Sequence, residues 1–166
     1  VEHAACVDAW MARTLVGLSP AELLPAFDGA FATVFGRAHK TLGEITLVAI
    51  LDRVVHDAAG RFPILAGLQV RPTGLVLEDL SSRIGGLGRA ALDGPIRFLF
   101  VEFLTVLGNL TGDILTPSLH AALAGSSPLP TDPGAVAARP GSDPARERRS
   151  TRPRRGGPGD GEDASS

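Results

Sequence analysis

The residues with the clearest chemical potential are four polar side chains in a strongly apolar stretch near the middle of the chain. Glu102, Thr105, Asn109 and Asp113 are spaced by three, four and four residues. On an α-helix they would form one stripe along a single face. We expect this stripe to face water while both flanks of the helix are buried. The alternative is that it lines a ligand pocket or a groove for a partner.

Glu102 is the candidate catalytic residue within this stripe. Phe98, Phe100 and Phe103 surround it in the sequence. A carboxyl group desolvated among aromatic side chains has the environment that a general acid or base requires. A small helical enzyme that uses Glu102 as its acid/base is therefore one alternative function.

Two glycines on the same segment, Gly108 and Gly112, are four residues apart. Small residues at this spacing let another helix approach closely. We interpret them as close-packing positions at a helix crossing inside the domain. The seam of a homodimer is the alternative.

The histidines and the single cysteine predict no metal site and no cofactor. His3, His39, His56 and His120 do not combine with one another or with acidic residues at the spacings typical of zinc ligands. Cys6 is the one cysteine of the chain, so an intramolecular disulfide is excluded.

A cluster of arginines near the end of the sequence is the strongest charge feature. A basic run of this kind can bind nucleic acid or an anionic surface in a salt-dependent way. We expect a solvated extension, with a weak electrostatic contact as the alternative, because acidic residues follow soon after. The arginines are Arg146, Arg148, Arg149, Arg152, Arg154 and Arg155.

The composition divides the chain into two parts. Residues 1–124 hold all seven Phe and the one Trp, whereas residues 125–166 hold seven Gly, seven Pro and seven Arg. A segment that is so poor in apolar side chains cannot offset the entropy of ordering. We therefore expect a single helical domain over 1–124 and a disordered tail over 125–166. The first part has nine basic and twelve acidic residues, which argues against nucleic-acid binding by the domain.

Apolar periodicity predicts a mainly α fold, a compact bundle of about five helices. Ser19, Pro20 and Glu22 form a capping box, and Pro25 should kink or restart the helix that follows. Gly17, Gly43 and Gly60 should end the first three helices. The predicted helical segments are 4–17, 19–42, 45–59, a weak one near 80–87, 95–115 and 117–124.

One small β-hairpin is expected at about 67–78. Apolar residues alternate with polar ones on both sides of Arg71-Pro72-Thr73-Gly74, a sequence typical of a tight turn. Because an isolated hairpin is marginally stable in water, it should lie against the helices or pair with another chain.

These features favour a non-enzymatic regulatory or adaptor domain that binds a partner protein. One lysine against fifteen arginines, with abundant Ala, Gly and Pro, suggests a bacterial coding sequence and so a role in bacterial signalling. The single cysteine fits the cytoplasm, and no segment is apolar enough to predict a membrane span. The helix predicted at 95–115 is apolar on nearly all sides, so it should be the central one. The main alternative function is a small-molecule sensor, with an apolar pocket between Phe27, Phe31 and Phe35 and this central helix.

Overall fold

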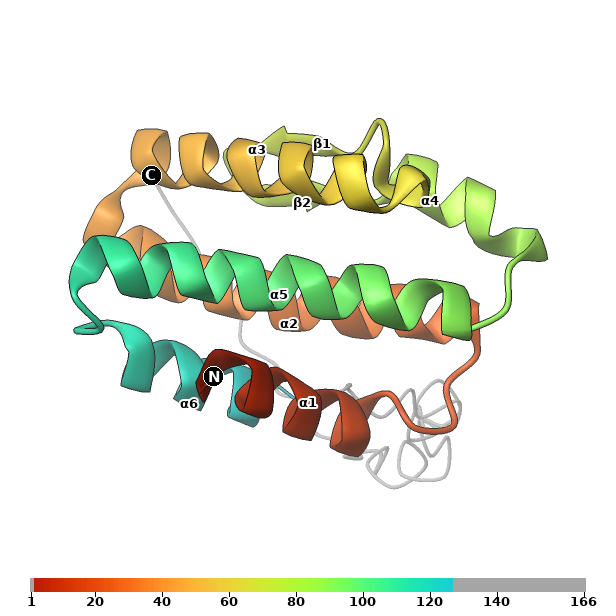
Figure 1. Ribbon diagram of the computed structural model, residues 1–166, viewed down its shortest axis with the longest axis horizontal. Helices are drawn as coiled ribbons and strands as arrows, with labels where there is room; N and C mark the ends of the chain where they lie inside the picture. Colours follow the sequence, from red (N-terminus) through yellow and green to blue (C-terminus); the bar gives the residue numbers. More distant parts are fainter. Residues whose placement is uncertain (1, 127–166) are drawn as a thin grey trace, which may run out of the picture. The chain divides into compact units, whose positions relative to one another are not determined.

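Six α-helices and one β-hairpin make up residues 2–126, the part of the chain that the computed structural model describes (Figure 1). The predicted mainly α bundle with one small hairpin is confirmed, with six helices in this part rather than about five. In chain order the elements are α1 (Glu2–Thr14), α2 (Pro20–Leu42), α3 (Glu44–Arg61), η1 (Pro63–Leu65), β1 (Gln69–Arg71), β2 (Gly74–Val76), α4 (Glu78–Arg83), η2 (Ile84–Gly86), α5 (Ala90–Thr111) and α6 (Thr116–Gly125).

The helices form three tiers, and α5 lies in the middle one. In Figure 1, α5 and α2 occupy the middle tier, α3 with the hairpin lies on one side of them, and α1 with α6 lies on the other. The contacts agree, because α5 packs on α1 and α3, and α2 packs on α6. The hairpin contacts α3 through β1 and α2 through β2.

The predicted capping box starts α2. The backbone N–H of Ser19 donates to Glu22 Oε2 at 2.9 Å, and the backbone N–H of Glu22 donates to Ser19 Oγ at 3.4 Å. The predicted restart at Pro25 is wrong, because α2 is one helix from Pro20 to Leu42. Pro25 lies close to the first turn, so its missing N–H removes only one early hydrogen bond from a well-capped helix.

A glycine terminates α2, and a proline terminates α3. Gly43 adopts φ +76°, a left-handed conformation that suits glycine, and its N–H donates to the carbonyl of His39 to end α2. The end of α3 was predicted at Gly60 but lies at Arg61. Phe62 has an extended backbone because Pro63 follows it, and this stops the helix.

The central helix α5 is shifted from the predicted range of 95–115. It begins at Ala90, because Leu92 is buried and extends the apolar face upstream of Pro95. It ends at Thr111, because Gly112 is left-handed and the N–H of Asp113 bonds back to the carbonyl of Gly108. Asp113 itself has φ +62° and lies in the turn between α5 and α6.

The predicted hairpin is confirmed in a shorter form. Strands β1 and β2 are antiparallel, with Val70 opposite Leu75 and Arg71 opposite Gly74 across the turn. The residues that follow form the short helix α4 and then the turn η2.

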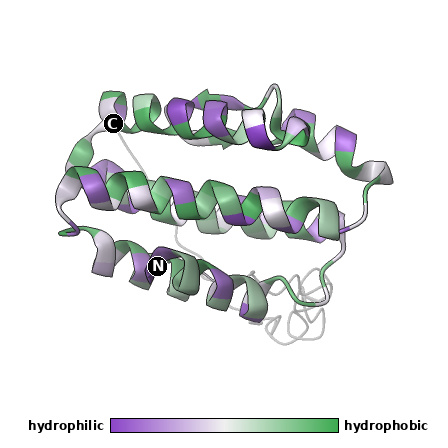
Figure 2. Ribbon diagram, in the orientation of Figure 1, coloured by the Kyte–Doolittle hydropathy of each residue, from purple (hydrophilic) through white to green (hydrophobic). Residues whose placement is uncertain are grey.

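Aromatic packing around α5 forms the centre of the core. Phe100 is fully buried, and its ring centroid lies 4.9 Å from that of Trp10 and 5.3 Å from that of Phe27. Phe31 lies 5.0 Å from Phe103. Figure 2 shows apolar residues along most of α5. Within residues 2–126, however, no helix combines the length and the apolar character needed to cross a membrane.

Polar contacts attach α1 to its neighbours. Arg97 of α5 forms a bidentate ion pair with Asp8, with N···O distances of 2.6 and 2.9 Å. Trp10 Nε1 donates to the carbonyl of Ser126 at 3.3 Å, and Arg13 donates to the carbonyl of Ala124 at 2.8 Å. These bonds connect α1 both to the central helix and to the end of α6.

The same substitution at two leucines of α5 should separate the buried face from the exposed one. Leu104 is fully buried, whereas Leu110 is 60% exposed. We expect Leu104→Ala to lower the free energy of unfolding by about 2–5 kcal/mol, because it leaves a cavity, and Leu110→Ala to change it by less than about 0.5 kcal/mol. Chemical denaturation measures both, and equal losses would contradict this packing.

Removal of the cap should weaken α2 from its start. Ser19→Ala leaves the N–H of Glu22 without its side-chain acceptor, so we expect a loss of about 0.5–2 kcal/mol. Thr33→Ala is the matched control, because Thr33 is exposed in the middle of α2 and bonds only to the carbonyl of Gly29. Thermal or urea denaturation distinguishes them; a Thr33 effect as large as that of Ser19 would count against the cap.

Candidate functional site

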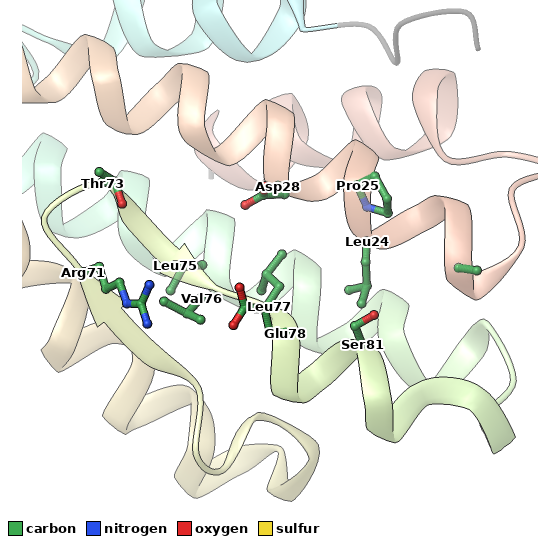
Figure 3. Close-up of a pocket in the computed structure, with 11 residues that line it drawn as sticks. Leu24, Pro25, Asp28, Arg71, Thr73, Leu75, Val76, Leu77, Glu78 and Ser81 are labelled. Carbon is green, nitrogen blue, oxygen red and sulfur yellow. The ribbon is translucent and has the colours of Figure 1, made fainter. Parts of the chain in front are cut away.

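A groove of about 430 Å³ lies between the first half of α2, the hairpin and the start of α4 (Figure 3). Leu24 of α2 is buried, and Leu75 and Leu77, on and just after β2, are half-buried; these three provide apolar lining. Figure 3 shows Asp28 on the α2 side, with Arg71 and the other hairpin residues facing it across the groove.

The local sequence explains why the hairpin forms one wall. Pro72 and Gly74 make the tight turn that brings β2 back against β1. Because β2 contacts α2 while β1 contacts α3, the hairpin is held against both helices. The sheet has two strands, so within the described residues one edge of each strand has no strand partner.

Three charged groups line this groove without being used in ion pairs. The ion pairs within residues 2–126 are Arg53–Asp57, Arg89–Asp93 and Arg97–Asp8, and none involves Asp28, Arg71 or Glu78. Loss of hydrating water raises the pKa of Asp28. A cation next to that carboxylate would lower its pKa again, so the site favours a positively charged group.

The polar stripe predicted on the central helix does not line this groove. Glu102 and Thr105 are half-buried, and Asn109 is exposed. The hydroxyl of Thr105 donates to the carbonyl of Val101 at 2.7 Å. Asp113 is exposed and lies past the end of α5, so the helical stripe ends at Asn109. Glu102 makes no side-chain hydrogen bond or ion pair to any other described residue.

The two predicted close-packing glycines have different environments. Gly108 is buried, and a Cβ there would lie 2.8 Å from Asp113 Oδ1 and 3.0 Å from His3 Nε2. Gly112 is exposed and ends α5 in the left-handed conformation. A helix approach therefore involves Gly108 alone, where the first turn of α1 comes close to α5.

Two of the four histidines meet. His3 Nδ1 lies 2.9 Å from His120 Nε2, between α1 and α6. His39 and His56 are exposed on α2 and α3. Within residues 2–126, no three His, Cys, Asp or Glu side chains are arranged so as to hold a metal ion.

Two further predictions concern the arginine cluster and an apolar pocket beside the central helix. The arginine cluster of 146–155 lies outside the described residues. The apolar pocket proposed beside the central helix would have to form where the rings of Phe27 and Phe31 pack on Phe100, at centroid distances of 5.3 and 5.4 Å. Aromatic side chains fill that space.

The sequence did not identify the groove residues. Asp28 was one of several polar positions on α2, and Arg71 and Glu78 were polar residues of a hairpin and its flank. The marginal stability of an isolated hairpin predicted that it would lie on the helices. That requirement does not determine which helix faces which strand. Comparisons with protein-family models, curated proteins and solved structures found no match.

Two glycine substitutions should have opposite effects. Gly36 lies in α2, and a Cβ there would meet nothing within 4 Å. We therefore expect Gly36→Ala to stabilise the protein by about 0.5–1 kcal/mol. Gly108→Ala should destabilise it by about 1–3 kcal/mol, because the new methyl group displaces His3 and Asp113. Urea denaturation measures both changes, and a stabilising Gly108→Ala would contradict the close approach.

Proposed function

We propose that this chain is a non-enzymatic regulatory or adaptor domain that binds a partner protein through the groove between α2, the hairpin and α4. The observation that carries the proposal is the combination of an apolar lining with charged groups that are not paired within the described part of the chain. Charged groups that no other residue of the 2–126 part pairs with remain available to a binding partner.

The chemistry of the lining favours an extended segment with an apolar side chain and a lysine or arginine. The apolar side chain would pack on Leu24, Leu75 and Leu77. The cation would lie near Asp28 and Glu78, whose two carboxylates outnumber the single guanidinium of Arg71. An extended backbone also suits a two-stranded sheet with open edges, because peptides commonly add to such edges as a further strand.

The setting in bacterial signalling and in the cytoplasm is part of the same proposal. Its support is compositional: one lysine against fifteen arginines, and a single cysteine. A homodimer, in which a second copy occupies the groove, is an alternative that the binding experiment separates.

A small-molecule sensor is the second candidate, and the volume of the groove favours it. Pockets for small ligands usually measure about 300–1,000 Å³, and this groove has about 430 Å³. The ligand would then be an amine with an apolar body. It would occupy the groove beside the hairpin rather than a cavity beside the central helix.

Binding of short synthetic peptides tests the proposal. The probe is a fluorescent peptide of about eight residues in which leucine alternates with lysine and serine, and the reference replaces lysine with glutamate. We expect the basic peptide to bind more tightly than the acidic reference. The double variant Asp28→Asn with Glu78→Gln should lower the affinity for the basic peptide about tenfold, or by about 1.4 kcal/mol. Arg71→Gln should raise the affinity for the basic peptide, because a charge that repels its lysine is removed.

A matched double variant controls for general electrostatics. Glu44→Gln with Asp52→Asn removes two exposed carboxylates from α3 and changes the net charge by the same amount. If this variant loses as much affinity as the groove variant, binding is non-specific and the proposal fails. Sedimentation of the unliganded chain identifies a dimer, and competition by a simple alkylamine at the same affinity would favour the sensor.

A further inference from the structure

A pair of imidazoles joins the first turn of α1 to α6. His3 Nδ1 and His120 Nε2 are 2.9 Å apart, and the rings meet edge to face at 83°. At this distance one nitrogen carries a hydrogen and the other accepts it. The pair can therefore form with no extra proton or with one. It cannot form with two, because both facing nitrogens would then carry a hydrogen, and both rings a positive charge.

Burial of His3 and its closeness to His120 disfavour the second proton. Burial and the repulsion from a charged His120 lower the pKa of His3 below its ordinary value of 6.5. Asp113, in the α5–α6 turn, and Glu2, on α1 itself, oppose this shift. The carboxylate of Asp113 accepts a hydrogen bond from Thr116 at 3.1 Å, which holds it beside Gly108 and His3.

Among the residues that the structure describes, no other hydrogen bond or ion pair of a side chain holds the first turn of α1. Glu2 and Ala5 are exposed and Ala4 is half-buried, so the turn contributes no large apolar side chain to the core. The first fully buried residue of α1 is Val7, and the ion pair of Asp8 with Arg97 follows directly. Loss of the imidazole contact should therefore free the first turn while the rest of α1 stays in place.

We propose that His3 and His120 form a pH-operated latch, which holds the first turn of α1 on α6 near neutral pH and releases it when the pair takes up a second proton. Release moves the His3 ring away from Gly108, where a Cβ would now lie 3.0 Å from His3 Nε2 and 2.8 Å from Asp113 Oδ1. The latch lies between α1 and α6, on the side of α5 and α2 away from the hairpin and its groove (Figure 1). It is therefore independent of the proposed peptide binding.

The direction of the pH effect follows from the lowered pKa of His3. The unfolded chain binds this proton more readily than the folded chain does. The stability that the neutral pair contributes is thus fully present above about pH 6.5, and it is lost as the pH falls through the lowered pKa. The released state is the acidic one.

Nuclear magnetic resonance of the full chain tests the latch. The measurement is the helical ¹³Cα shift of residues 2–5 as the pH is lowered from about 7.5 to about 4.5, well below the ordinary histidine pKa, with EDTA present. We expect the native chain to lose about half or more of this shift at the acidic pH, as the pair takes up its second proton. His120→Gln keeps a hydrogen-bonding amide but no titratable group, so its first turn should remain helical at both pH values.

His56→Gln is the matched control, because His56 is exposed on α3 and should leave the native behaviour unchanged. The latch is overturned if the native first turn keeps its helical shift at acidic pH. It is also overturned if His120→Gln loses that shift to the same extent as the native chain. If His120→Gln does not fold, His3→Gln removes the charge from the other side of the pair and carries the same expectation.

Discussion

Phe100 occupies the centre of α5 with no exposed surface, and the rings of Trp10, Phe27 and Phe31 surround it at centroid distances of 4.9–5.4 Å. These rings come from α1 and α2, so one buried side chain joins three helices. A helix that is apolar around most of its circumference is stable in water only if other helices cover it. This requirement determines the arrangement of the other helices: α3 covers α5 on one side, and α1 with α6 covers it on the other.

The candidate sites lie where this coverage ends. The hairpin is too short to form a full layer, with three residues in each strand, so a groove remains between it and α2. On the other side, the first turn of α1 has no large buried apolar side chain. An imidazole pair holds this turn against α6 instead. Both places hold polar groups that the core does not use. Such groups can respond to a ligand or to a proton without disturbing the aromatic centre.

Elements with strong local signals were predicted well. The capping box of Ser19 and Glu22 depends on residues three apart, and the turn before Gly74 depends on neighbouring residues, so both follow from local sequence. The restart at Pro25 and the start of α5 at Pro95 were wrong. Packing of Leu23, Leu24 and Leu92 against the core stabilises helix on both sides of each proline, and propensity alone does not include that energy.

Apolar periodicity and turn residues act over a few positions, so they were enough to predict a mainly α domain with a hairpin. The nearly continuous apolar surface of α5 also indicated that this helix is central. Which polar residues become neighbours depends on the three-dimensional packing. His3 and His120 are 117 positions apart, and Asp28 and Arg71 come from separate elements, so no spacing could connect them. Packing of the helices around α5, rather than distance along the chain, brings these side chains together.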